Sequence, residues 1–423
     1  MSAESHAAPA IGPLVGLKVL EMGSLIAGPF CGRLLADFGA TVIKIEPPDG
    51  DALRTWSLVT EHGSLWSLVQ SRNKHSVTAD LRTAEGRELA RSLASECDVL
   101  IENFRPGRME EWGLGFEELE RVNPGIVMVR ISGYGQTGPN AHKPGFGNIA
   151  ESVGGLRHIT GWPDGPPLRV GLSLADTIAA LYGVIGTLMA LQERNTSGRG
   201  QIVDVALTES VFSVLEAILP EYGYDGRTRG RSGNTLNGAA PSNVYRTGDD
   251  RWLAIGGNSD GIFARLAKAI GMPELAGDQR FSTNQGRRQF HDELDAVIAE
   301  WVAGRTADEA QAALDEHSVP CGPVHSIADI VADPQFQARD MVLDVPHAGL
   351  GRILMPGLVP RLGRTPGAIR WAGPEVGAHD RMVAREGFKV GEGTSADSEI
   401  VDLGEHDWID DPPCSQPSEG SQS

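Results

Sequence analysis

Residues 17–46, LKVLEMGSLIAGPFCGRLLADFGATVIKIE, decide the fold of the first half of the chain. Residues 17–22 and 41–46 have the short, mostly apolar composition of buried strands, and the residues between them place apolar side chains at helical spacing. A strand, a helix and a second strand in this order predict a parallel sheet that binds its ligand at the carboxyl ends of the strands. The turn GSLIAGP at 23–29 lacks the GxGxxG pattern, so a nicotinamide dehydrogenase is not expected.

The same alternation continues to about residue 222 and predicts a doubly wound α/β domain. Its expected helices include one capped by Thr83 and one that runs through residues 211–218. Composition changes near Gly223, where a stretch rich in Gly, Asn and Arg at 222–243 leads into a smaller, mostly helical segment. Residues 319–326 are expected to form a turn, and residues 341–362 a hairpin. This stretch is either a functional loop or a plain interdomain linker. The expected parts are a large domain at 1–222, a linker and small domain at 223–340, a return to the large domain at 341–388, and an acidic disordered tail at 389–423.

The charge of the chain excludes some partners. The formal net charge is -19, which argues against nucleic acid or an anionic membrane as a partner, because either would require a basic face. No apolar run approaches the roughly 20 residues of a membrane helix, and the N-terminus lacks a signal-peptide pattern. We therefore expect a cytoplasmic protein without a membrane partner.

The cysteines and histidines give no sign of a metal site. The four cysteines show neither CxxC spacing nor a nearby His pair, and no HExxH pattern occurs. We expect reduced thiols, no metal and no tightly bound cofactor.

Asp176 is the candidate catalytic residue. It interrupts the apolar run 166–194 at the point where helical spacing begins. The simpler interpretation is a helix N-cap, because Asp oxygens accept the unpaired N–H groups of a first turn. The same N–H groups would also keep a carboxylate ionised, as a nucleophile requires.

Segment 103–108, NFRPGR, follows a predicted strand and could bind a coenzyme. Arg105 and its neighbours could pair with phosphate, and Phe104 could stack on a base or a pantetheine arm. Arg82 is a second cationic candidate, and Phe146 lies between glycines that could approach a thioester. Each of these residues could equally be a solvated arginine or a buried aromatic.

Six ordered motifs together resemble the family III CoA transferases, the group of formyl-CoA transferase and carnitine CoA-transferase. The resemblance covers about residues 16–388. The motifs are residues 16–48 (GLKVLEMGSLIAGPFCGRLLADFGATVIKIEPP), NKHSVTADLRTAEG, DVLIENFRPG, GLSLAD, GRGQIVDVAL and VPCGPVHSIADIVADPQFQAR.

The resemblance implies a Rossmann-like large domain, a smaller α+β domain and an interlocked homodimer. It implies that the catalytic nucleophile is Asp176, and that coenzyme A and acyl-CoA are substrates together with a small carboxylic acid. The residues that correspond to family CoA contacts are Ala27, Arg82, Asn103, Phe104, Arg105, Phe146 and Gly147. The mobile active-site loop corresponds to Asn237, Gly238, Ala239 and Ala240.

The expected reaction moves CoA from an acyl-CoA donor to a carboxylic acid acceptor through an aspartyl-CoA thioester. Succinyl-CoA is the expected donor because it is a frequent donor in the family that the chain resembles. Ile26 and the pair Phe146–Gly147 replace polar residues of formyl-CoA transferase, which argues against formate and oxalate as substrates. We hypothesise that Arg169 recognises a second carboxylate of the acceptor acid. The alternatives are an α-methylacyl-CoA racemase-like enzyme, which would need a His near Phe146, and a non-catalytic CoA-binding subunit.

Overall fold

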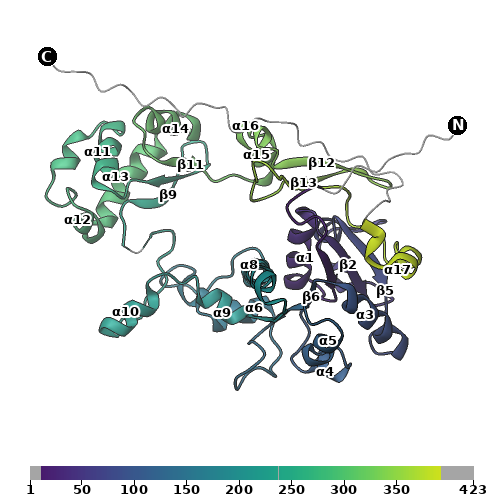
Figure 1. Ribbon diagram of the computed structural model, residues 1–423. Coiled ribbons are helices and arrows are strands. Elements are labelled where there is room, and N and C mark those ends of the chain that lie inside the picture. The colour runs from purple at the N-terminus through teal and green to yellow at the C-terminus, as the bar shows by residue number, and fades with distance from the viewer. Residues whose placement is uncertain (1–10, 237, 392–423) are drawn as a thin grey trace, which may run out of the picture. The chain divides into compact units, whose positions relative to one another are not determined.

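The computed structural model describes residues 11–236 and 238–391. The described chain divides into two compact units (Figure 1). Unit 1 contains residues 11–155, 171–216 and 337–391, and unit 2 contains residues 156–170, 217–236 and 238–336. The sequence analysis placed residues 156–170 in the first domain, whereas they belong to the second unit. The proposed functional boundaries stay a prediction.

Unit 1 is built on a six-stranded sheet in which every neighbouring pair of strands is parallel. The strand order is β5-β2-β1-β6-β7-β8, so the chain winds outward from β1 in one direction and then from β6 in the other. Ligands of such sheets bind where the winding reverses, outside the carboxyl ends of the strands. The strands are β1 (Lys18–Glu21), β2 (Thr41–Glu46), β5 (Lys74–Thr78), β6 (Val99–Glu102), β7 (Val127–Ser132) and β8 (Ile202–Ala206).

Helices cover both faces of this sheet (Figure 1). On one face, α1 and α8 pack on the sheet and on each other, while α3, α5 and α17 lie on the opposite face. Thr83 accepts a hydrogen bond from the Gly86 N–H, which confirms it as the predicted cap of α3. The helices of unit 1 are α1 (Ala27–Asp37), α2 (Leu65–Gln70), α3 (Ala84–Glu96), α4 (Arg108–Glu111), α5 (Phe116–Val122), α6 (Gly147–Val153), α8 (Leu174–Ser197), α9 (Leu207–Phe212) and α17 (Asp380–Glu386), with the short 3-10 helix η1 (Ala52–Thr55).

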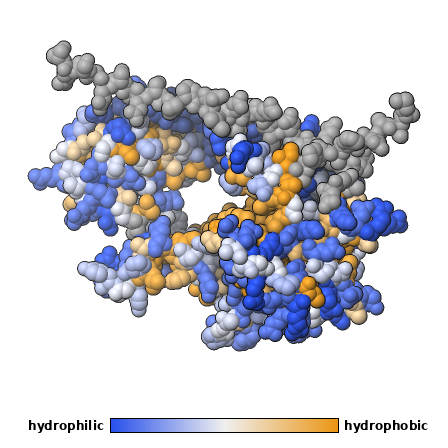
Figure 2. All heavy atoms as spheres, in the orientation of Figure 1, coloured by the Kyte–Doolittle hydropathy of each residue, from blue (hydrophilic) through white to orange (hydrophobic). Residues whose placement is uncertain are grey.

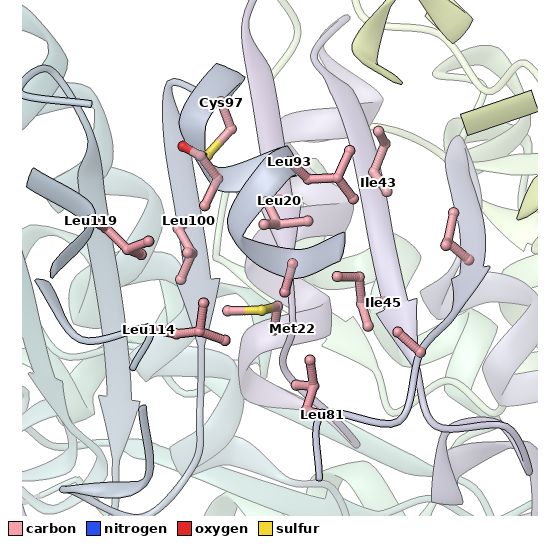
Figure 3. Close-up of a cluster of buried hydrophobic side chains, with 14 of the residues drawn as sticks. Leu20, Met22, Ile43, Ile45, Leu81, Leu93, Cys97, Leu100, Leu114 and Leu119 are labelled. Carbon is pink, nitrogen blue, oxygen red and sulfur yellow. The ribbon is translucent and has the colours of Figure 1, made fainter. Parts of the chain in front are cut away.

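The core between the sheet and α3 is apolar and fully enclosed (Figure 3). Every second residue of a strand points to the same face, so Leu20 of β1 and Met22 just after it lie beside Ile43 and Ile45 of β2. Each fully buried side chain of this size contributes about 1.5–3 kcal/mol to folding. This core fixes the relative positions of the strand ends where a ligand would bind.

The C-terminal segment from residue 337 belongs to unit 1. The expected hairpin within 341–362 is β12 (Val342–His347) paired with β13 (Gly351–Pro356). A second two-stranded ribbon is formed by β3 (Val59–Thr60) and β4 (Gly63–Ser64). The prediction started the acidic tail at residue 389, but residues 387–391 form the 3-10 helix η3 (Gly387–Gly391), and Val390 is 1% exposed in the core. The rest of the predicted tail lies outside the described residues.

Unit 2 combines a small sheet with helices. Its three antiparallel strands have the order β11-β10-β9. The loop predicted at 222–243 is shorter than expected, because α10 extends to Asp225 and β9 begins at Ser242, where it pairs with β10. The elements are α7 (Leu156–Ile159), α10 (Ile218–Asp225), β9 (Ser242–Arg246), β10 (Trp252–Gly256), α11 (Asp260–Ala269), η2 (Pro273–Gly277), α12 (Asn284–Gln289), α13 (His291–Ala303), α14 (Ala307–Glu316), β11 (Cys321–Pro323) and α15 (Ile327–Ala332), while α16 (Pro334–Ala338) spans the boundary with unit 1.

Helix α8 leaves a broad apolar stripe uncovered (Figure 2). Leu181, Ile185, Leu188 and Met189 lie on one helical face, and each is between 43% and 68% exposed. By length and composition alone, α8 is the one helix of the described residues that could cross a membrane. This is weak evidence, because α8 packs on the sheet of unit 1 through its other face.

Candidate active site

Asp176 lies in the first turn of α8, at its third residue. The expectation that the helix begins at Asp176 was therefore wrong by two residues, and the N-cap is Ser173, whose side chain makes no capping hydrogen bond. The helix dipole still favours a negative charge in this turn. Asp176 is half-buried, so its carboxylate is neither in the core nor fully in water.

Gly147, the first residue of α6, packs directly against the Asp176 carboxyl group. A Cβ atom at Gly147 would lie 2.0 Å from Oδ2 and 2.9 Å from Cγ of Asp176, a separation that non-bonded atoms do not adopt. Only glycine permits this contact. A Cβ atom at Gly145, two residues earlier, would lie 2.9 Å from the Gly133 Cα just after β7, which places this segment at the carboxyl edge of the sheet.

Asn103 joins the end of β6 to the turn after β1. Its Oδ1 accepts the Ser24 N–H at 2.8 Å, and its Nδ2 donates to the Ser24 carbonyl at 2.8 Å. A Cβ at Gly23 would lie 2.8 Å from the same Oδ1, so the turn must pass close to this amide. The structure thus uses both hydrogen-bonding groups of Asn103 to hold the turn, and the turn leads into α1 at Ala27, which is buried.

Two further side chains hold this turn. Asp51 accepts the N–H of Leu25, a residue with φ of +64°, through both carboxyl oxygens at 3.0 and 3.1 Å. Gln70 donates its side-chain amide to the Ile26 carbonyl at 2.9 Å. Burial would raise the pKa of Asp51, but the nearby Lys44 charge and backbone donors lower it overall. The backbone from Ser24 to Ile26 is therefore fixed at each residue.

A buried charge cluster lies behind the turn. Lys44 contacts Glu21 at 2.9 Å and Asp51 at 2.9 Å, and donates to the Gly23 carbonyl at 2.8 Å. Burial would lower the pKa of Lys44, but Glu21 and Asp51 raise it overall. Lys74 contacts the other Glu21 oxygen at 2.7 Å, and burial lowers its pKa to about 8. Charged residues inside otherwise apolar strands were the signal that the sequence analysis missed.

Phe104 is partly buried rather than presented as a free stacking face. Its ring meets the Trp112 ring edge to face, with the centroids 5.0 Å apart, and it packs against the core under α3. Its N–H donates to the buried Glu102 carboxylate at 2.7 Å, which fixes the start of the segment. Burial raises the pKa of Glu102 to about 7, against the lowering effect of Arg130.

The two cationic candidates differ. Arg105 is exposed and forms no ion pair with any residue that the structure describes. Arg82 is 81% exposed and is held by Asp80 through hydrogen bonds of 2.8 and 2.9 Å. The structure thus leaves the Arg105 guanidinium available, whereas a phosphate would have to compete with a carboxylate for Arg82. Phe146, which precedes α6, is 65% exposed.

Side chains of helix α12 form hydrogen bonds to residues 238 and 240, which belong to the segment that corresponds to the family's active-site loop. Asn284 donates to the Gly238 carbonyl at 2.9 Å and accepts the Ala240 N–H at 3.1 Å. The fully buried Arg287 donates to the Ala240 carbonyl at 2.8 Å. Asn237, which belongs to the same predicted loop, lies outside the described residues. This segment belongs to unit 2, whereas Asp176 belongs to unit 1.

The cysteines that the structure describes carry no activated thiol at Cys31 or Cys321. Burial raises the pKa of Cys31 to about 12, and burial together with Asp315 raises the pKa of Cys321 to about 11. Within residues 11–236 and 238–391, no group of three His, Cys, Asp or Glu side chains could hold a metal ion. The raised pKa values disfavour the thiolate form of Cys31 and Cys321.

The parallel sheet, the contact of Asp176 with Gly147 and the fixed turn before α1 are typical of an α/β enzyme whose candidate site lies at the carboxyl edge of the sheet. Residues 14–380 match the description of CoA-transferase family III, and the chain belongs to this family. This confirms the resemblance seen in the sequence. The chain is therefore a CoA transferase, which acts on CoA thioesters.

Curated relatives are similar over most of their length. Succinyl-CoA–D-citramalate CoA-transferase of Chloroflexus aurantiacus is 50% identical over 88% of this chain and 93% of the relative. The beta subunit of succinyl-CoA–L-malate CoA-transferase from the same organism is 41% identical over 88% of this chain and 94% of the relative. A crystal structure of a CAIB/BAIF family protein from Brucella suis superposes with a TM-score of 0.80 at 36% identity, covering 89% of this chain and 99% of that one.

Proposed function

We propose that this enzyme transfers CoA from succinyl-CoA to a small dicarboxylic acid, with Asp176 as the nucleophile. The observation that carries the proposal is the contact of the Asp176 carboxyl group with Gly147, which leaves no side chain between the carboxylate and the backbone of α6. A half-buried carboxylate in the first turn of a helix is kept ionised by the helix dipole, and an ionised carboxylate can attack a thioester.

The reaction proceeds in balanced steps. The Asp176 carboxylate attacks the thioester carbonyl of the donor, expels CoA thiolate and forms a mixed anhydride. The thiolate attacks the aspartyl carbonyl, which forms an aspartyl-CoA thioester and releases the donor acid as its carboxylate. The acceptor carboxylate then attacks this thioester, and the returning thiolate cleaves the second anhydride to give the new acyl-CoA and free Asp176. No ATP is consumed, because the activated acyl group stays covalent throughout.

The backbone held around Ser24 supplies the coenzyme side of the site in this proposal. The turn is fixed by Asn103 and Asp51, so the start of α1 at Ala27 presents a rigid edge to the ligand. Arg105, exposed and without an ion pair among the described residues, is the phosphate-binding candidate that the geometry favours over Arg82. Phe104, Phe146 and Gly147 stay candidate CoA contacts.

The substrate proposal is supported by the relatives. Two relatives are named for pairing succinyl-CoA with D-citramalate and with L-malate. Ile26 and Phe146 stand where formyl-CoA transferase has polar residues, which also argues against the smallest acids as acceptors. A four- or five-carbon dicarboxylic acid, with or without a hydroxyl group, is therefore the acceptor class that we propose.

We further propose that the protein is a cytoplasmic homodimer. The uncovered stripe of α8, formed by Leu181, Ile185, Leu188 and Met189, is the kind of apolar surface that an oligomer buries. The net charge of -19 disfavours an anionic membrane as the cover for this stripe.

Trapping the aspartyl-CoA intermediate tests the function. The wild-type protein and Asp176→Ala are incubated with succinyl-CoA and then with hydroxylamine, and intact masses are measured. A hydroxamate on the wild type alone supports the proposal. Absence of an adduct with a panel of acyl-CoA thioesters contradicts it, and exchange of the α-proton in heavy water would then distinguish the racemase from the non-catalytic subunit.

A further inference from the structure

Unit 2 contains a pocket of about 430 Å³ that includes the segment around Gly238. Its walls come from residues 235–236 and 238–242, from α12 and from the start of α13. In Figure 1, α12 and α13 follow each other beside β9. The same helix therefore holds the segment through Asn284 and Arg287 and lines the pocket through Gln285, Arg288 and Gln289. A ligand in this pocket would contact both the segment 238–242 and helix α12, which holds this segment by hydrogen bonds.

Arg288 is the cation of this pocket. Its side chain is exposed, and its guanidinium forms no ion pair with a described residue, whereas the neighbouring Arg287 pairs with Asp260 and Arg280 pairs with Asp278. A guanidinium presents several N–H donors in a plane that matches a carboxylate. This lining residue is thus the natural partner for an anion.

Asp295, the acidic residue of the pocket lining, already has hydrogen-bond partners within the protein. The Asp295 carboxylate accepts hydrogen bonds from the Tyr245 hydroxyl at 2.5 Å and from the Asn243 amide at 2.9 Å. His291, also in the lining, contacts Asp292 at 3.2 Å. The remaining polar groups, those of Gln285, Gln289, Ser242 and Thr235, are neutral donors and acceptors. The pocket combines one available positive charge with groups that can bind a hydroxyl.

We propose that this pocket binds a small dicarboxylic acid, and that Arg288 pairs with one of its two carboxylates. The inference rests on the proposed function for the substrate class and names the residue that selects it. A carboxylate on Arg288 would distinguish diacids from monoacids, while Ser242 and Gln289 would accommodate a hydroxyl such as the one that malate carries. Arg288 is a binding residue in this proposal and takes no part in the transfer of CoA.

Direct binding tests the proposal without turnover. Asp176→Ala provides the background, because it removes the proposed nucleophile, and succinate and butyrate are titrated into it by calorimetry. Adding Arg288→Ala should weaken succinate binding about tenfold or more, should leave butyrate and CoA within about twofold, and should be partly reversed by Arg288→Lys. Arg246→Ala is the matched control, because Arg246 is an exposed arginine of unit 2 outside the pocket.

Three results would overturn the proposal. Equal losses for succinate and butyrate would show that Arg288 acts on the fold of the pocket. A selective loss of CoA would show that the pocket binds a phosphate of the coenzyme. A succinate affinity that responds to Arg169→Ala and not to Arg288→Ala would assign the second carboxylate to Arg169. Because no step requires Asp176, a negative hydroxylamine experiment would refute the catalytic proposal and leave this one standing.

Discussion

Replacing Gly147 with Ala is the sharpest test of how Asp176 is positioned. The new methyl group would lie 2.0 Å from Asp176 Oδ2, and real Cβ atoms essentially never approach closer than 3.0 Å. The carboxylate must therefore move by at least about 1 Å, a displacement that can reduce catalysis about 100-fold. Gly147 has no positive φ and begins a helix, so Ala adds no backbone strain and should change the free energy of unfolding by about 1 kcal/mol or less.

The measurement is the initial rate of succinyl-CoA consumption together with the melting temperature of each variant. Gly261→Ala is the matched control, because Gly261 also lies in the first turn of a helix and its Cβ would meet nothing within 4 Å. We expect the control to keep wild-type activity and Gly147→Ala to lose about two orders of magnitude in kcat at an unchanged melting temperature. A Gly147→Ala protein within threefold of wild type would refute the proposed link between this contact and catalysis.

Three other changes have expected outcomes. Asn103→Asp loses the donor to the Ser24 carbonyl, so we expect the KM for acyl-CoA to rise about tenfold, and an unchanged KM would show that the turn does not contact the coenzyme. Ile185→Asp places a charge on the uncovered stripe of α8 and should convert a dimer to a monomer in light scattering; a wild-type mass that is already monomeric would contradict the dimer. Burial lowers the pKa of His75 from 6.5 to about 3. Between pH 6.5 and about 3 the unfolded chain therefore binds a proton at His75 that the folded chain does not bind. The free energy of unfolding should fall by about 1.4 kcal/mol for each pH unit as the pH falls through this range. His75→Phe should remove that part of the acid dependence in urea titrations, and an unchanged slope would assign it to other groups.

The order of elements in unit 1 was largely predictable because each strand carries its own local pattern. The predicted strand 41–46 agrees with β2, and the predicted hairpin within 341–362 is present. The errors occurred where tertiary contacts override local preference. A single helix was expected through residues 211–218, but the chain breaks between α9 and α10 at Glu216, which has φ of +51°. The turn predicted at Cys321 is a strand, because it pairs with β10.

The sequence by itself determined the α/β class, the family and the identity of the candidate residues, because strand and helix periodicity and ordered motifs are local properties of a chain. Only the tertiary structure decided what these residues contact. Residues distant in the sequence, such as Asn103 and Ser24, meet at adjacent strand ends, and Lys44 ties the same turn to Glu21. The closeness of Gly147 to Asp176 likewise follows from packing between two helices, since no local pattern encodes the distance between a glycine and a carboxylate 29 residues later.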